Sequence, residues 1–259
     1  MSDSILISIE GGLARVTLNR PGSLNAMDFE MAERWRDAAR AATAPGVGAV
    51  ILDAAGPAFC AGGDVVAMAT SGAGGAGVTE MAHVIHDGIR TLVESDKPIV
   101  AVVQGAVAGG GLGLMLTADY IVASEQAKFV SRYANIGLTP DLGVSTLLPA
   151  AVGQRRALQL LLQDLTIDAA TAAEWGLITE VAADPAARGD EIARFWLEGA
   201  TAAFGHAKRL IRTGAHRSFA ANLDDEAASI GARFDTDESR VRVAAFAAAS
   251  RKNTPKENA

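Results

Sequence analysis

Short apolar runs alternate along the chain with longer segments of helical periodicity. Residues 5–9 and 13–18 alternate between apolar and polar positions around Gly11-Gly12, which predicts a β-hairpin. Asp28 stands at the N-cap position of a predicted helix over residues 29–42. Further short apolar runs predict buried strands, and they cover residues 47–52, 99–103 and 120–123. Strands that alternate with helices favour an α/β fold built in layers.

The last part of the chain has a different pattern. After about Asp184 the strand signals stop and helical patterns take over. These patterns cover residues 191–203, 206–214, 223–234 and 238–250. We therefore predict a main domain over residues 1–199 and a helical tail over residues 200–259.

Composition and charge limit the kinds of partner. The chain has 259 residues, 49% hydrophobic and 20% charged, as is typical of globular proteins. Acidic residues outnumber basic ones by 30 to 23, so no overall positive field favours nucleic acid or an anionic membrane. The single cysteine, Cys60, excludes an intrachain disulfide, and residues 1–10 lack a secretory pattern, so we expect a cytoplasmic protein. Residues 99–118 are apolar enough for a membrane span, but their five glycines favour a strand, a turn and a helix.

Several common enzyme motifs are absent or misplaced. A dinucleotide-binding fingerprint that begins at Gly109 would need glycine at position 114, which is Leu114. Residues 72–77 match that fingerprint by letter, but we interpret them as a flexible glycine loop at the end of a long loop over residues 54–77. No lysine follows a glycine, and no serine lies in a G-x-S-x-G pattern. His83 and His86 have the spacing of a polar helix face and lack the further ligands of a metal site.

Two glycine-rich segments, residues 59–64 and 109–111, are each followed by sequence compatible with a helix. Glycine allows the backbone to approach a ligand closely, and the first N–H groups of a helix are unpaired. Two such segments can direct two N–H groups at one oxygen, which is an oxyanion hole. Tight packing and turns also account for these glycines, so the residues by themselves leave both interpretations open.

With their flanking residues, these segments resemble the crotonase (enoyl-CoA hydratase/isomerase) superfamily over nearly the whole chain. The matching motifs, in family order and spacing, are Leu18-Asn19-Arg20-Pro21 with Asn25-Ala26-Met27, residues 59–64, Gln104-Gly105 with Gly109-Gly110-Gly111, Ala118-Asp119, Ile136-Gly137-Leu138 with Pro140, and Ala172 to Ile178. The resemblance implies a crotonase-type α/β fold, a spiral of ββα/βαβ repeats with a C-terminal helical trimerisation subdomain. It also implies a homotrimer or a dimer of trimers.

The resemblance further implies that residues 1–199 bind and transform an acyl-CoA thioester. Coenzyme A would be part of the substrate, and no cofactor or metal would be bound permanently. Gly63 and Gly110 match the positions whose N–H groups hold the thioester oxygen. Phe246 resembles a residue that packs near the CoA of a neighbouring subunit. The CoA path would be lined, largely by backbone, at Gly22, Ser23, Leu24, Ala61, Gly62 and Asp64.

Hydratases of this superfamily use two glutamates, and this chain has Gly113 and Tyr133 at the matching positions. A phenol, with an ordinary pKa of ~10, is a poor base near neutrality, so efficient hydration is not expected. Asp141, which follows Pro140, instead resembles the catalytic aspartate of members that move double bonds in enoyl-CoA or ring-derived thioesters. Pro-Asp before a helix is also an N-cap signal, so capping is an alternative role for Asp141.

The expected activity is therefore double-bond isomerisation of an enoyl-CoA with Asp141 as the base. The alternatives are hydration by an atypical route, another crotonase reaction on aromatic-derived CoA thioesters, and acyl-CoA binding without catalysis. We interpret Asp64 chiefly as a cap that orients the glycine segment beside it. We interpret Cys60 as a small packing residue, since no histidine stands beside it in the sequence.

Overall fold

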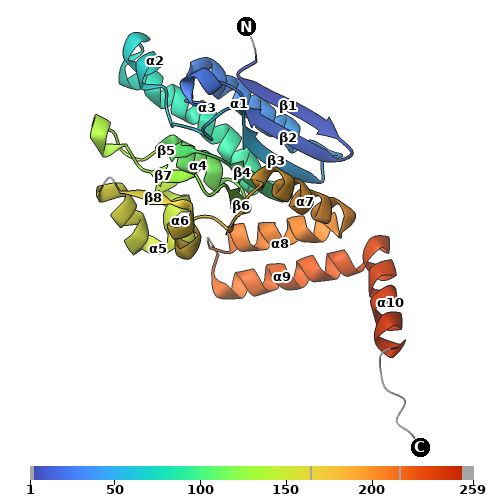
Figure 1. Ribbon diagram of the computed structural model, residues 1–259. Helices are drawn as coiled ribbons and strands as arrows, with labels where there is room; N and C mark the ends of the chain where they lie inside the picture. Colours follow the sequence, from blue (N-terminus) through green and yellow to red (C-terminus); the bar gives the residue numbers. More distant parts are fainter. Residues whose placement is uncertain (1–2, 164, 216, 253–259) are drawn as a thin grey trace, which may run out of the picture.

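The computed structural model describes residues 3–163, 165–215 and 217–252 (Figure 1). In these residues the larger sheet has six strands in the order β1-β2-β3-β4-β6-β9. β1 (Ile5–Glu10) and β2 (Leu13–Leu18) form the predicted antiparallel hairpin, and the strands from β2 onward are parallel. The other strands of this sheet are β3 (Ala49–Ala54), β4 (Ile99–Val103), β6 (Tyr120–Ala123) and β9 (Glu180–Val181). A second sheet contains β5 (Ala106–Ala108), β7 (Lys128–Val130) and β8 (Thr166–Asp168).

Helices follow most of the strands, as an α/β fold requires. In chain order they are α1 (Phe29–Ala42), α2 (Val65–Thr70), α3 (Gly74–Glu94), α4 (Gly110–Leu116), α5 (Val144–Leu162), α6 (Ala169–Trp175), α7 (Pro185–Glu198), α8 (Thr201–Gly214), α9 (Phe219–Phe234) and α10 (Asp237–Lys252). Two 3-10 turns, η1 (Pro21–Ser23) and η2 (Ala134–Ile136), lie in the connections. The predicted helix over residues 29–42 is confirmed, and Asp28 caps it by accepting a hydrogen bond from the Met31 N–H at 2.8 Å.

The central strands are buried on both faces of the larger sheet. In β3, Val50 and Leu52 belong to one hydrophobic core, to which α1 and α3 contribute, while Ile51 belongs to a second core on α7. From α7, Ile192 and Trp196 pack into this second core. Because both faces are covered, these strands are continuous apolar runs in the sequence rather than alternating ones. The sheet therefore provides a rigid support for the loops that leave its strands.

Several local predictions are corrected by the structure. The strand expected over residues 47–52 begins later, at Ala49. The long loop expected over residues 54–77 is wrong in part, because it contains α2 and the beginning of α3. The signal for α2 is weak because this helix has only six residues and none of them is buried. The fingerprint match at residues 72–77 follows α2 and overlaps the beginning of α3, so it lacks the strand of a dinucleotide site.

The C-terminal part is helical, as predicted, although α7 begins at Pro185 rather than near residue 191. Lys208 joins α8 to the main body: its buried ammonium group donates to the Leu92 and Lys97 carbonyls, each at 2.8 Å, and pairs with Asp119 at 3.2 Å. α9 packs on α8, and Figure 1 shows α10 projecting away from the sheets. Residues 253–259 of the predicted tail lie outside the described residues. No helix among the described residues is long and apolar enough to cross a membrane.

Candidate functional site

A cavity of about 290 Å³ lies where the two glycine-rich segments meet. Gly62 and Gly63 line it from the first segment, and Gly109 and Gly110 from the second. The rest of its wall is mainly apolar, with a few polar groups: Ala61, Val65, Met68, Ser131, Arg132, Tyr133, Asn135, Ile136, Leu138 and Asp141. A mostly apolar cavity with a few convergent polar groups has the character of a small-molecule site.

Backbone hydrogen bonds hold the two glycine segments side by side. The Ala108 N–H, next to the second segment, donates to the Cys60 carbonyl of the first at 2.9 Å, and the Met27 N–H fixes the first segment by donating to the Gly62 carbonyl at 2.8 Å. Gly62 has φ +98°, and a Cβ at this position would lie 2.9 Å from the Ala108 carbonyl oxygen. Glycine is therefore required here both by the dihedral angle and by the close approach of the second segment.

The N–H groups of Gly63 and Gly110 have no hydrogen-bond acceptor among the described residues. The neighbouring amides differ: the Asp64 N–H donates to the Met27 carbonyl at 2.9 Å, and the Gly109 N–H donates to the Val130 carbonyl at 3.1 Å. The Gly110 N–H is unpaired because Gly110 is the first residue of α4, and the Gly63 N–H lines the same cavity. They are available to a ligand oxygen, in the manner of an oxyanion hole.

Asp141 contributes a half-buried carboxylate to the same cavity. Tyr133 donates its hydroxyl hydrogen bond to Asp141 Oδ1 at 2.6 Å. Burial raises the pKa of Asp141, while the Tyr133 hydrogen bond opposes the rise. The alternative role as an N-cap is wrong: α5 has Gly143 as its N-cap residue, and no side chain caps it.

The backbone around Asp141 is held in an unusual conformation. Leu142 has φ +48°, which is uncommon for a side chain of its size. Its N–H donates to His86 Nε2 at 3.2 Å, a bond that requires the neutral imidazole. Burial lowers the pKa of His86 and so favours that neutral form. The interpretation of His86 as part of a polar helix face is therefore incomplete. His86 contacts Leu142, 56 residues further along the chain, and the spacing between His83 and His86 does not indicate this contact.

Gly113 occupies a position with no space for any side chain. A Cβ there would lie 2.0 Å from the Leu142 carbonyl oxygen, and real Cβ atoms do not approach backbone atoms this closely. The segment that carries Asp141 thus fills the space next to Gly113. A glutamate at this position is excluded by the backbone as well as missing from the sequence.

The predicted CoA-path residues lie around the first glycine segment. Gly22 and Ser23 are in η1, and Leu24 next to it accepts a hydrogen bond from the Ala61 N–H at 3.0 Å. Asp64 caps α2 through the Ala67 N–H at 3.0 Å, which agrees with its structural interpretation. Phe246 is 77% exposed on α10 and does not line the cavity of its own chain.

Two residues near this segment have structural roles. The fully buried Asn25 donates from its amide to the Ala55 and Ala58 carbonyls at 2.9 and 2.8 Å. Cys60 is also fully buried, and burial raises the pKa of its thiol to about 12, so it packs rather than attacks. Among the described residues, no group of three or more histidine, cysteine, aspartate or glutamate side chains could hold a metal ion.

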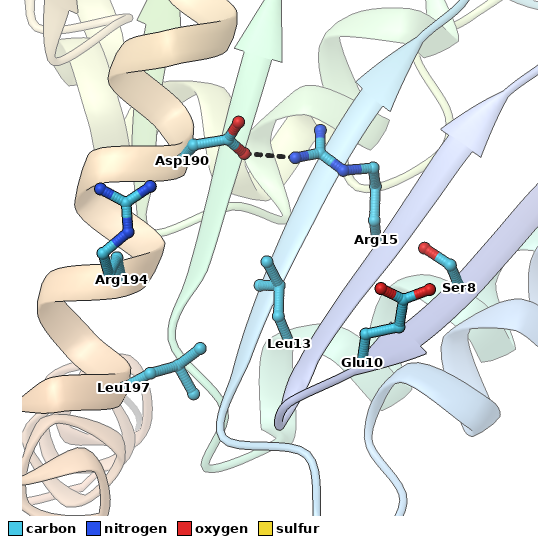
Figure 2. Close-up of a pocket in the computed structure, with 7 residues that line it drawn as sticks. All are labelled: Ser8, Glu10, Leu13, Arg15, Asp190, Arg194 and Leu197. Atoms are coloured by element: carbon cyan, nitrogen blue, oxygen red, sulfur yellow. Dashed lines mark hydrogen bonds and ion pairs between the residues drawn. The ribbon is translucent and has the colours of Figure 1, made fainter.

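A second cavity, of about 400 Å³, lies between the β1–β2 hairpin and α7 (Figure 2). Arg15 of β2 pairs with Asp53 at 2.5 Å and also with Asp190 of α7, so two carboxylates share one guanidinium group. Figure 2 shows Glu10 and Arg194 at opposite sides of this cavity. Its charged groups join the hairpin to α7, and we interpret it as a structural contact.

Comparisons with known proteins agree with the motifs and the fold. The family model for enoyl-CoA hydratase/isomerase matches residues 8–254. A Mycobacterium tuberculosis protein named "probable enoyl-CoA hydratase" is 37% identical over 196 residues, 74% of either chain. The 1,2-epoxyphenylacetyl-CoA isomerase of Escherichia coli is 33% identical over 234 residues, 87% of this chain and 88% of that protein. A Thermobifida fusca structure in complex with CoA superimposes with a TM-score of 0.82 at 29% identity, covering 90% of this chain and 93% of the other.

Proposed function

The chain belongs to the enoyl-CoA hydratase/isomerase family, and we propose that it moves a carbon–carbon double bond within an enoyl-CoA thioester. The observation that carries this proposal is the position of Asp141 in the same cavity as the unpaired N–H groups of Gly63 and Gly110. These two N–H groups would hold the thioester oxygen. Asp141 would take the proton from C2 of a 3-enoyl thioester and return it to C4.

The charges in the cavity support this chemistry. Removal of the C2 proton places negative charge on the thioester oxygen, where fixed N–H donors stabilise it. A base is more effective when its pKa lies closer to the working pH, and burial moves Asp141 in that direction. One carboxylate is sufficient, because the proton leaves and returns through the same group.

Hydration by the usual two-glutamate route is not supported by the residues present. The position of the first glutamate is Gly113, which the Leu142 carbonyl closes to any side chain. The second is Tyr133, whose hydroxyl group donates to Asp141. Burial and the neighbouring carboxylate raise the pKa of Tyr133 well above its usual range, so it does not serve as a base for water.

A second candidate is the same proton transfer on an aromatic-derived CoA thioester. The observation that favours it is the similarity to a relative named 1,2-epoxyphenylacetyl-CoA isomerase. Residues that would contact the acyl group in either case include Val65, Met68, Ile136 and Leu138.

Incubation with 3-enoyl-CoA and 2-enoyl-CoA in heavy water, followed by mass spectrometry, tests these assignments. Isomerisation predicts interconversion of the two thioesters, and deuterium enters the acyl chain to the extent that the carried proton exchanges with solvent. Hydration instead yields 3-hydroxyacyl-CoA. A protein that only binds acyl-CoA gives neither product nor exchange, and this result would overturn the proposal. The same assay on ring-containing CoA thioesters decides between the two substrate classes.

We also propose that the protein assembles as a homotrimer or a dimer of trimers. Large apolar side chains remain exposed on the last helices, including Phe219 (80%), Ile230 (73%) and Phe246 (77%). Exposed apolar surface of this extent is typical of subunit interfaces. Phe246 would then pack near the CoA of a neighbouring subunit. A stable monomer in sedimentation at micromolar concentration would contradict the assembly.

A further inference from the structure

Tyr133 lies between the glycine turn and the carboxylate of Asp141. It follows β7, whose last residue, Val130, accepts the hydrogen bond from Gly109 that fixes the turn. Tyr133 is 8% exposed, and its ring carbon Cζ lies 4.0 Å from the position that a Cβ on Gly109 would take. The ring is thus packed beside the glycines, and its hydroxyl group lies beside Asp141.

The contact between the two side chains has the geometry of a charge-assisted hydrogen bond. The distance from the Tyr133 hydroxyl oxygen to Asp141 Oδ1 is 2.6 Å, within the range of about 2.5–2.7 Å typical of a hydroxyl on a carboxylate. Since the pKa of Tyr133 is raised, the phenol keeps its proton and acts only as donor. Oδ1 is therefore occupied, and no donor of the described residues hydrogen bonds to Oδ2.

The position of the carboxylate relative to Gly110 makes this contact important. Asp141 Oδ1 lies 3.6 Å from the point where a Cβ on Gly110 would be, so the carboxylate sits beside the turn that would hold the thioester oxygen. An aspartate side chain has two rotatable bonds, and proton transfer requires one oxygen to face the reacting carbon. A bond to Oδ1 restricts both torsions at once.

We propose that Tyr133 is a positioning residue for Asp141: its hydroxyl group holds Oδ1, and Oδ2 is the atom that takes and returns the substrate proton. This inference rests on the proposed function of Asp141 as the base. Tyr133 keeps its own proton throughout. Oδ2 accepts the proton from C2 and gives it to C4, so the carboxylate is regenerated in each cycle and no further reactant is needed.

The test replaces only the hydroxyl group, with Tyr133→Phe, and uses Tyr120→Phe as the matched control. Tyr120, in β6, is the other of the two tyrosines of the chain and does not line the cavity. Loss of a hydrogen bond to a charged group should lower the kcat of Tyr133→Phe by roughly 10- to 100-fold. KM should change little, because the ring and the backbone donors remain. Tyr120→Phe should retain the wild-type kcat.

The pH profile separates positioning from simple packing. The Tyr133 hydrogen bond lowers the pKa of Asp141, so its removal should move the acid limb of kcat/KM to higher pH. A merely structural tyrosine would change Tm without moving this limb. If Tyr133→Phe keeps both the wild-type kcat and the wild-type acid limb, the inference is overturned.

A readout independent of activity distinguishes failure of this inference from failure of the proposed function. Carbon-13 NMR of aspartate-labelled protein follows the Asp141 carboxyl group through a pH titration, and the Asp141→Asn variant assigns its signal. A rise in the pKa of Asp141 in Tyr133→Phe supports the pairing, even if the wild type isomerises no thioester and the proposed function fails. An unchanged pKa overturns the pairing, whatever the wild type catalyses.

Discussion

Two cavities among the described residues differ in the charges that surround their carboxylates. The larger one, between the hairpin and α7, is lined by Glu10 and by Asp190, and Asp190 pairs with Arg15, which also pairs with Asp53 of β3. The smaller one has Asp141, which is bound by the neutral Tyr133. It also has two N–H groups without an acceptor. Size alone would favour the larger cavity, whereas the proposed chemistry requires the smaller one.

The difference reflects two uses of the same chemical group. A carboxylate in an ion pair has a matched charge and a fixed partner, so it joins elements and has little tendency to take a proton. A carboxylate held in a partly apolar wall by a neutral donor has a raised pKa, and it is then suited to proton transfer. Substitutions in the two cavities should therefore have different consequences, and the same Asp→Asn change can be made in each.

Asp141→Asn should have the largest effect. Asparagine keeps the size of the side chain and can accept the Tyr133 hydrogen bond, but it cannot take a proton from carbon. The rate of 3-enoyl to 2-enoyl conversion should fall about 10²- to 10⁴-fold, the usual contribution of a positioned acid or base. Affinity for the CoA thioester should persist, because the proposed donors are backbone groups. A variant that keeps more than about a tenth of the wild-type rate would rule out Asp141 as the base.

Gly110→Val should have the next largest effect, through the backbone rather than through a charge. A Cβ at Gly110 would lie 2.6 Å from Leu142 Cδ1, so valine would displace the segment beside Asp141 and crowd the thioester oxygen. Turnover should fall at least about 10²-fold, the loss of one oxyanion donor. Gly75→Val is the control, since a Cβ there meets nothing within 4 Å. Circular dichroism checks folding, and unchanged turnover would remove Gly110 from the site.

The pH dependence tests the raised pKa of Asp141. Activity needs the ionised carboxylate, so kcat/KM should fall by about tenfold for each pH unit below this pKa. The acid limb of kcat/KM should lie at a pH above ~3.9, the ordinary pKa of an aspartate.

The stability of the protein should depend on pH in the opposite direction to its activity. A carboxyl group whose pKa is raised in the folded state stabilises the protein at low pH, and this contribution is lost as the pH rises through the raised pKa. Asp141→Asn should therefore unfold at the wild-type temperature or slightly above it at neutral pH, and a clearly lower Tm would contradict the burial argument.

Much of the fold follows from local patterns in the sequence. The hairpin, α1 and the strand β4 lie where alternation, capping and apolar runs place them. The shortest elements do not: β5, β7 and β8 have three residues each, too few for a periodic signal. Their positions depend on long-range pairing, which a pattern along the chain does not contain.

The site divides in the same way. Gly63, Gly110 and Asp141 were identified through motifs, and the structure brings all three to one cavity. In the sequence, Tyr133 stands out only as the residue at a glutamate position, and His86 only as part of a polar helix face. Their contacts with Asp141 and Leu142 depend on side-chain direction and on how α3 packs against the loop before α5. Residue type and spacing do not encode those contacts.

Asp190→Asn should have the smallest effect and makes the comparison of the two cavities direct. The side chain of Asp190 is 44% exposed, and Arg15 keeps Asp53 as a partner when Asp190 loses its charge. Exposed ion pairs contribute at most about 1 kcal/mol, so the free energy of unfolding should fall by no more than this. The kcat/KM for enoyl-CoA should equal that of the wild type, because the change lies outside the glycine-lined cavity. Suppose instead that Asp190→Asn loses as much activity as Asp141→Asn while its Tm is unchanged. The cavity between the hairpin and α7 would then take part in the reaction, and the pairing of carboxylates with arginine would not distinguish a structural cavity from a catalytic one.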